Sequence, residues 1–284
     1  MAFDLVWGIA LIVALAAGLF LATASLARHW SPRVLSGVAV LVVGALLLYI
    51  RSVWYDVRLA QWLPVSNLIV VGNWLPLLAA VLGGIVWEKA RDCSWRRIGS
   101  TAALACTALY ALLYPVLGSP PRCENRWDWS GNCLQTTDLT CSAASAATLL
   151  RAHGIESSEQ EMADLCLTRH GTSWQGLYRG LKLKTAGTKW DVQVVACSQP
   201  ELPRLRGPLI ISVGLESSAR GDTDYTREFG WVPGVNHSVI LHGFTNFGCA
   251  IIADPTQELS REQWDEEMLR VLWRGYAIRL VERP

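Results

Sequence analysis

The sequence predicts an α-helical transmembrane segment of about four helices, followed by an α+β domain. Two observations lead to this fold class. Hydrophobic residues make up 51% of the 284 positions, and they are concentrated in the first 117. The second half instead mixes helical patterns with short apolar runs typical of strands. We therefore expect a membrane domain over residues 1–117, a linker over 118–133 and a separate folded domain over 134–284.

Four apolar runs fill the first domain, and each approaches the roughly 20 residues that span a hydrocarbon core of about 30 Å. The first run lacks a basic front, carries Asp4 and is longer than a typical signal-peptide core, which favours a retained helix over a cleaved signal. In the third run, Asn67, Asn73 and Pro76 predict a kink or a polar contact within the bundle. The runs cover residues 5–26, 34–50, 63–87 and 98–117.

Basic residues are unevenly distributed among the loops that connect these runs. The first and third loops lie on one side of the membrane and the second loop lies on the other. The positive-inside rule assigns the side richer in Lys and Arg to the cytoplasm. We therefore expect the N-terminus and the second domain on the non-cytoplasmic face. The richer side holds Arg28, Arg33, Lys89, Arg91, Arg96 and Arg97, and the other side holds Arg51 and Arg58.

The linker contains two cysteines, Cys123 and Cys133, on either side of a short polar loop. On an oxidising face of a membrane, such a pair favours a disulfide. A metal site is disfavoured because no His or second Cys pair lies at ligand spacing, and we expect no cofactor. The formal net charge is +1. Because this charge indicates no basic face, we also expect no nucleic-acid partner.

A third cysteine, Cys141, is followed by a run of small residues and then by two leucines. Small residues let a helix begin in a confined space, and the N–H groups of a helix N-terminus lower the pKa of a nearby thiol. Gln135 lies six residues upstream, where a side-chain amide can donate to an oxyanion. Taken alone, the pattern also fits a buried structural cysteine beside a linker glutamine.

Two histidines compete for the role of general base. His237 begins an apolar stretch typical of a strand and His242 lies near its end. Alternate side chains of a strand face opposite sides, so the two rings point to different faces. His237 adjoins a long polar loop, 216–235, which is a candidate lid or insertion. We favour it as the base and interpret His242 as a surface or satisfied core residue. A second strand ends at Asp254, which either orients the base or only forms a turn.

Capping patterns predict further helices in this half. Ser158 begins a capping box before a helix that runs to about Arg169. A second capping box, from Ser260 to Gln263, predicts a further helix. Helices come first and strands follow. This order favours an α+β domain in which an antiparallel sheet packs against the helix of Cys141.

The second half resembles the papain-like cysteine peptidases that remove leader peptides from bacteriocins, the double-glycine peptidase family. The resemblance extends over about residues 134–281 and implies a papain-like fold and a peptide or protein substrate. It makes Cys141 the nucleophile, His237 the base, Asp254 the orienting residue and Gln135 the oxyanion donor. The residues that carry it are Gln135, Cys141, His237, Asp254 with Pro255, and the closing Trp273-Arg-Gly275.

Three functions fit this resemblance. The first is a membrane-anchored cysteine peptidase. The second is an inactive peptide-binding module that assists export or assembly; it stays open because Thr140-Cys141-Ser142 replaces the usual Asp-Cys-Gly. The third is a papain-fold acyltransferase that uses the same Cys and His. We expect an integral protein of a bacterial inner membrane. Its expected partners are the lipid bilayer, the substrate and export machinery acting in trans.

Overall fold

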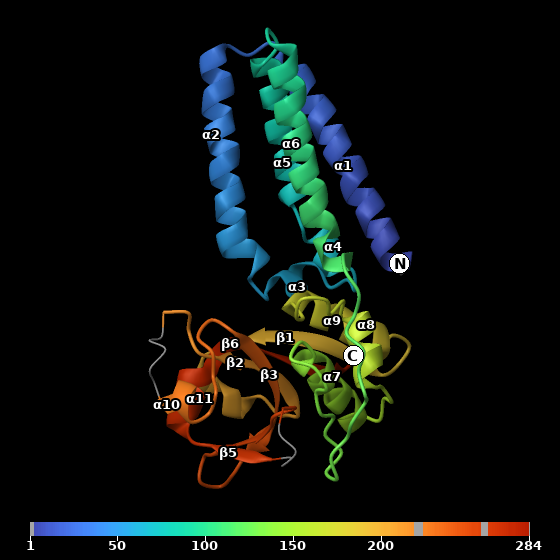
Figure 1. Cartoon of the computed structure of the whole chain (residues 1–284), viewed down its shortest axis with the longest axis vertical. Helices are drawn as coiled ribbons and strands as arrows, with labels where there is room; N and C mark the ends of the chain where they lie inside the picture. The colour runs from blue at the N-terminus through green and yellow to red at the C-terminus, as the bar shows by residue number, and fades with distance from the viewer. Residues whose placement is uncertain (1–2, 219–223, 257–260, 284) are drawn as a thin grey trace. The chain divides into compact units, whose positions relative to one another are not determined.

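The computed structural model describes residues 3–218, 224–256 and 261–283 (Figure 1). The chain divides into two compact units, Met1–Leu117 and Gly118–Pro284. The first unit consists of helices, and the second combines helices with an antiparallel sheet. The predicted fold class is therefore confirmed.

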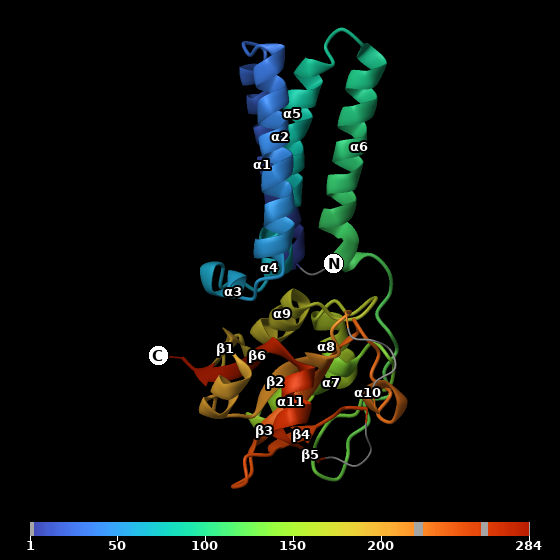
Figure 2. The ribbon, with the colours of Figure 1, turned by 90° about the vertical axis from the view of Figure 1, so that its left-hand side faces the viewer.

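Within the described part of the chain, four helices are long and apolar enough to cross a membrane. Two of them are not continuous α-helices: the second ends in a π-helical turn and the third is interrupted (Figure 2). The elements of this unit are α1 (Phe3–Ala27), α2 (Pro32–Tyr49) with η1 (Ile50–Trp54), α3 (Leu59–Trp62), α4 (Leu68–Val71), α5 (Leu75–Lys89), and α6 (Ser94–Leu113) with η2 (Tyr114–Val116).

The break between α4 and α5 is held by polar contacts with other helices. Asn67 Nδ2 donates to the Asp4 carbonyl of α1, and Asn73 Nδ2 donates to the Ala111 carbonyl of α6, both at 3.1 Å. The Tyr49 hydroxyl bonds to the carbonyl of Gly72 and accepts the N–H of Trp74. A broken helix at membrane depth needs such partners for its freed backbone groups. The two asparagines are therefore contacts within the bundle, and the kink is not merely local.

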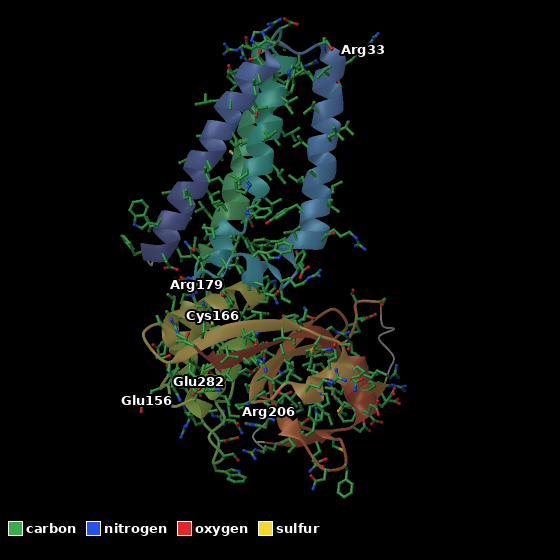
Figure 3. The ribbon with its side chains drawn as sticks, turned by 180° about the vertical axis from the view of Figure 1, so that it is seen from behind. Arg33, Glu156, Cys166, Arg179, Arg206 and Glu282 are labelled. Carbon is green, nitrogen blue, oxygen red and sulfur yellow. The ribbon has the colours of Figure 1, made fainter. Side chains whose placement is uncertain are left out.

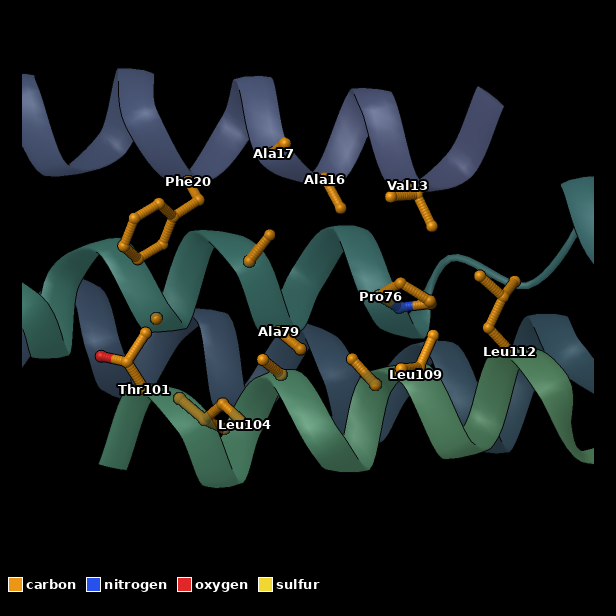
Figure 4. Close-up of a pocket in the computed structure, with 14 residues that line it drawn as sticks. Val13, Ala16, Ala17, Phe20, Pro76, Ala79, Thr101, Leu104, Leu109 and Leu112 are labelled. Atoms are coloured by element: carbon orange, nitrogen blue, oxygen red, sulfur yellow. The ribbon is translucent and has the colours of Figure 1, made fainter. Parts of the chain in front are cut away.

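Small residues let the membrane helices approach closely. A Cβ atom at Gly84 of α5 would lie 2.8 Å from Thr23 Cβ and 2.9 Å from the Phe20 carbonyl oxygen of α1, so only glycine fits there. Between α1, α5 and α6 remains an apolar cavity of about 430 Å³ (Figure 4). Alanines and Gly83 form much of its wall, and Thr101 contributes the polar side chain that Figure 4 shows there.

The second unit begins with three helices and continues with a six-stranded sheet among its described residues. Figures 1 and 2 show the helices gathered beside the sheet. The helices are α7 (Cys141–Ala152), α8 (Glu159–Leu165) and α9 (Trp174–Thr185), with the later α10 (Asp224–Arg227), α11 (Glu266–Leu272) and the 3₁₀ helix η3 (Gln199–Arg204). The strands are β1 (Trp190–Ala196), β2 (Leu209–Gly214), β3 (Asn236–Phe244), β4 (Ala250–Ala253), β5 (Glu262–Trp264) and β6 (Trp273–Glu282).

The sheet has the order β1-β6-β2-β3-β4-β5, and each neighbouring pair is antiparallel. Alternate residues of the central strands face opposite sides. Ile211, Val213 and Val239 point into an apolar core that also contains Leu269 and Leu272 of α11. The residues between them point to the other face, where α7 contacts β2 and β3. The helix of Cys141 therefore packs on the sheet, as expected.

Helix α8 packs against α9 through a close approach at Gly180. A Cβ atom at this glycine would overlap the sulfur of Cys166, which is completely buried at the end of α8. Arg179, beside it in α9, is also buried and donates from Nη1 to the Leu165 carbonyl at 2.6 Å (Figure 3). An arginine that fills this space satisfies a carbonyl at the C-terminus of α8, where a cation is favourable.

The predicted caps have different outcomes. Ser158 caps α8 by accepting the Glu161 N–H at 3.1 Å, as expected, but the helix ends at Leu165 and not near Arg169. The later cap is wrong. Ser260 lies outside the described residues, Glu262 and Gln263 belong to β5, and Asp265 caps α11 by accepting the Met268 N–H at 2.7 Å. The candidate lid contains the short helix α10, and its residues 219–223 lie outside the described part.

Candidate active site

Cys141 is the first residue of α7, and the residues from Ser142 to Leu150 are all buried. Ala143 and Ala144 are completely inaccessible to solvent. The first turn of α7 therefore carries small side chains that fit against the surrounding protein. The backbone of Ser238 on β3 also helps to lower the pKa of Cys141. As expected from the sequence, the small residues after Cys141 let a helix begin in a confined space, and the thiol lies at its N-terminus inside the domain.

His237 and Asp254 meet where the start of β3 lies beside the end of β4. His237 is at the start of β3, and Asp254 directly follows β4, the antiparallel neighbour of β3. Because the two strands run in opposite directions, the start of one lies beside the end of the other. His237 Nε2 lies 2.8 Å from Asp254 Oδ1, and the carboxylate is buried. The structure thus brings together the predicted base and its predicted orienting residue.

The thiol of Cys141 and the imidazole of His237 shift each other's pKa through hydrogen bonding and charge. Burial alone would raise the pKa of the Cys141 thiol, but the hydrogen bond and the charge of His237 outweigh it, and the pKa is lowered. Burial would likewise lower the pKa of His237, but the hydrogen bonds to Asp254 and Cys141 raise it to about 10. Both shifts favour a thiolate next to an imidazolium. Asp254 holds Nε2, which leaves Nδ1 for the sulfur.

The pKa of Asp254 is lowered as well. Its burial acts to raise the pKa, but the hydrogen bond and charge of His237 and two bonds from Thr256 outweigh this effect. Thr256 donates its N–H at 2.8 Å and its hydroxyl at 2.6 Å to the Oδ1 atom that His237 contacts. The carboxylate therefore stays charged and fixed in direction.

Gln135 lies next to this group. Its backbone N–H donates to the Pro255 carbonyl at 2.8 Å, which ties it to the residue that follows Asp254. Its side-chain Oε1 is buried and has no hydrogen-bond partner among the described residues. A buried polar group without a protein partner needs an explanation. Because Oε1 is an acceptor, an N–H group of a bound peptide fits it and an oxyanion does not; the oxyanion role predicted for Gln135 would use its Nε2 atom.

His242 lies where the pairing of β3 with β4 shifts register, between Leu241 and Gly243, so strand alternation does not fix the side of its ring. It is half-buried, and its Nε2 atom has no hydrogen-bond partner in the part of the chain that the structure describes. It is therefore not the satisfied core residue that the sequence suggested. Burial lowers its pKa, mainly because the charged form is desolvated. Since Asp254 and Cys141 contact His237, the contacts favour His237 as the base.

The two linker cysteines are free thiols in the structure, as are the other six cysteines of the chain. Burial and the charge of Glu159 raise the pKa of Cys123 to about 11 and of Cys133 to about 12. The charge of Cys123 also contributes to the shift of Cys133, so the two groups interact. Their pairing stays a prediction.

Several neighbours of the site have no signal of their own in the sequence. The Trp231 ring meets the His237 ring edge-on, with centroids 5.9 Å apart. Burial raises the pKa of Tyr276, a hydrogen bond from Ser212 lowers it, and the charge of Cys141 raises it further. Thr256 is the exception that sequence reasoning could have found, because it follows Asp254-Pro255 and a hydroxyl there can reach the carboxylate.

A polar groove of about 620 Å³ lies beside the start of β3. Asn236, the residue before His237, lines it together with residues 215–218 and the first residues of β6. Arg274 of β6 donates to the carbonyls of Gly214 and Val271, and its Nη1 lies 3.7 Å from Glu216 Oε1. The groove therefore offers polar groups of both charges, and Cys141, His237 and Asp254 do not line it.

No protein-family model and no curated protein matches the sequence. Among solved structures, the peptidase domain of Streptococcus ComA, a bi-functional ABC transporter involved in a quorum-sensing pathway, is 20% identical. It matches over 53% of this chain and 96% of its own, with a TM-score of 0.42. A double-glycine-motif protease from an AMS/PCAT transporter, in complex with the leader peptide, is 18% identical over 53% of this chain and 89% of its own, with a TM-score of 0.40.

The peptidase domain of Streptococcus mutans ComA is 20% identical over 52% of this chain and 96% of its own, with a TM-score of 0.36. This chain is thus similar to double-glycine peptidase domains, and among its described residues four candidate membrane helices precede the domain that contains Cys141.

Proposed function

We propose that the chain is a membrane-anchored cysteine peptidase, with residues 134–284 as its peptidase domain. One observation carries the proposal: Asp254 holds His237 Nε2 at 2.8 Å, and this histidine lowers the pKa of the Cys141 thiol at the start of a buried helix. A nucleophile, a base and a group that orients the base are what thiol hydrolysis requires.

The chemistry follows from these contacts. The Cys141 thiolate attacks the carbonyl carbon of a peptide bond, and the carbonyl oxygen becomes an oxyanion. The Gln135 amide and the Cys141 N–H are the proposed donors to that oxygen. The His237 imidazolium gives its proton to the leaving amine, so a thioester remains on the sulfur. His237 then takes a proton from water, which attacks the thioester and releases the carboxylic acid.

The peptide chain of the substrate is proposed to lie along the groove beside β3. The groove reaches Asn236, the residue before His237, whereas Cys141 and His237 do not line it, so the part of the substrate proposed to lie there flanks the cut bond. The exposed carbonyl and amide groups of a peptide fit polar walls that carry Arg274 and Glu216.

The sidedness of the domain is also a proposal. Six basic residues at one end of the helical bundle oppose two at the other, which supports a non-cytoplasmic peptidase domain of a bacterial inner-membrane protein. Arg28 and Arg97 at the basic end lie 3.7 and 3.5 Å from the carboxylate of Glu88, which is buried. A substrate would then be cut after or during export, and export machinery would act in trans.

The reactivity of the thiol tests the proposed catalytic pair. The full chain, in native membranes, is labelled with iodoacetamide from pH 5 to pH 10, and mass spectrometry reads the label at Cys141. We expect labelling well below the pH of about 8.5 at which a free thiol ionises. His237→Ala should abolish this early labelling. His242→Ala, which removes the same kind of ring from a later position on the same strand, should leave it unchanged.

The opposite result identifies an inert binding module. A wild-type profile that rises only near pH 8.5 and ignores His237→Ala makes Cys141 an ordinary thiol. If the thiol is activated, the products decide between hydrolysis and transfer. A peptidase leaves a free carboxylic acid and a transferase leaves the acyl group on a new amine or hydroxyl.

A further inference from the structure

Two serines directly follow the proposed nucleophile and the proposed base. Ser142 comes after Cys141 on α7, and Ser238 comes after His237 on β3. Their hydroxyl oxygens lie 2.8 Å apart, although 96 residues separate them in the chain. Both side chains are buried, with 5% and 9% exposure. The bond therefore joins the helix of the thiol to the strand of the imidazole, one residue away from each.

Two more contacts converge on the same strand residue. The Ser145 hydroxyl, one turn further along α7, donates to the Ser238 carbonyl at 3.0 Å. The side chain and the carbonyl of Ser238 are thus bonded to two different residues of α7. The Ser238 backbone also helps to lower the pKa of Cys141. We name the hydroxyl pair of Ser142 and Ser238 the serine clasp.

Hydrogen bonding inside a protein adds little net stability, because water offered the same bonds before folding. An alanine pair at these two positions would fill the space with less desolvation cost. A hydroxyl pair instead fixes the relative position of the two elements. Two short side chains can meet at 2.8 Å only in one register of α7 against β3. Slippage of α7 along β3 would break the pair and at the same time would change the distance from Cys141 to His237.

We propose that the serine clasp sets the separation of the thiol and the imidazole, so that Ser142 and Ser238 are positioning residues of the Cys141–His237 pair. The proposal rests on the proposed function, since it concerns the geometry of that pair. The Ser142 hydroxyl bonds to β3 and also lies 4.0 Å from the Cys141 sulfur, whose pKa it helps to lower. Ser238→Ala removes the clasp and keeps that direct contact, so it separates positioning from the direct effect of Ser142.

The double variant Ser142→Ala/Ser238→Ala separates positioning from stability. Each single variant leaves one buried hydroxyl without its partner and should lower the melting temperature. The double variant removes both and should regain most of that loss. Its Cys141 labelling at pH 6 should nevertheless stay low, by roughly 10-fold to 100-fold, because a shift of about 1 Å in a reacting group costs on the order of 100-fold in rate.

A second hydroxyl pair in the same unit supplies the control. Thr168 Oγ1 and Thr172 Oγ1 lie 2.7 Å apart, and Thr168 is completely buried. Thr168→Val removes this pair without a change of shape and should leave the labelling profile as in the wild type. Thr168 and Thr172 belong to the turn before α9, and the pair is made within that turn, apart from α7 and β3.

The outcomes separate the clasp from the proposed function. If the wild-type thiol labels early and the double variant keeps the same profile, the clasp is refuted while the peptidase proposal stands. If the wild-type thiol labels only near pH 8.5, the peptidase proposal fails and takes the clasp with it. Should the double variant not fold, Ser238→Ala decides alone, because it removes the clasp and keeps the Ser142 hydroxyl that lies 4.0 Å from the Cys141 sulfur.

Discussion

Replacement of Asp254 by Asn removes the charge beside His237 and keeps the shape of the side chain. Asp254 Oδ1 accepts hydrogen bonds from His237 Nε2 at 2.8 Å and from the N–H and hydroxyl of Thr256. The carbonyl oxygen of an asparagine can accept the same bonds, so the ring keeps its orientation. The variant therefore measures what the negative charge contributes to the imidazolium next to Cys141.

The geometry sets the size of this contribution. Unit charges about 4 Å apart interact by about 4 kcal/mol at an effective dielectric constant of about 20, which corresponds to roughly three pKa units. The side chains of His237 and Asp254 are only 15% and 7% exposed, so water screens the pair little. Dipoles of the remaining hydrogen bonds offset part of the loss. We expect the labelling midpoint of Cys141 to rise by roughly one to three pH units, toward the value of about 8.5 of a free thiol.

The assay is iodoacetamide labelling of Cys141 across pH 5 to 10, on the full chain, with the label read at the peptide level. Asp191→Asn is the matched control, because it removes a carboxylate that lies 2.7 Å from Lys182 Nζ, away from the site. Its profile should overlay that of the wild type. If the Asp254→Asn profile overlays it too, the carboxylate does not stabilise the imidazolium and the reasoning is refuted.

The same variant has a signature in stability. The pKa of Asp254 is lowered from 3.8, so its contribution to folding is present above pH 3.8 and is lost as the pH falls through the lowered pKa. The pKa of His237 is raised from 6.5 to about 10, so its contribution is complete below pH 6.5 and is lost as the pH rises through 10. The difference in melting temperature between wild type and variant should be largest between these limits, from about pH 4 to pH 6.5, and a difference that does not vary with pH would contradict the charge pair.

Three further predictions use the rest of the chain. A reporter that is active only in the cytoplasm, fused after Pro284, should be silent, because six basic residues oppose two in the loops; strong activity would reverse the topology. Cys123 and Cys133 should be disulfide-bonded in the native membrane and Cys141 should be free, as mass mapping of non-reduced peptides will show; the short loop limits the stabilisation to at most about 3 kcal/mol. Gln135→Ala should leave thiol labelling unchanged and should lower turnover by about 100-fold to 1000-fold, since it acts on the oxyanion; equal turnover would remove Gln135 from the site.

Local patterns predicted the elements of the candidate site well. The small residues after Cys141 indicated a buried helix start, and this inference needs only neighbours in the sequence. The alternation argument for His237 and His242 did not anticipate the register shift of β3 against β4 between Leu241 and Gly243. The contact between His237 and Asp254 also follows, once β3 and β4 are taken as a hairpin whose open ends meet.

Contacts that depend on register could not be predicted. The pair of Ser142 and Ser238 needs the axial position of α7 against β3, which no pattern in either element sets. The Ser260 cap failed because the residues after it pair with β4, and tertiary pairing outweighs a local capping motif. The hydrogen-bond partner of Asn73 could not be predicted for the same reason, because the sequence does not say which carbonyl of a neighbouring helix lies opposite.

The most direct measurement of the central claim is a comparison of protein termini in cells that carry the wild-type chain or Cys141→Ala. Mass spectrometry of enriched N-terminal peptides detects cut and uncut proteins across the whole cell, so the substrate need not be chosen in advance. We predict that at least one exported protein keeps its uncut form in the variant and carries a new N-terminus only with the wild-type chain. Identical sets of termini in the two strains, with both chains present in equal amounts, would contradict the assignment as a peptidase.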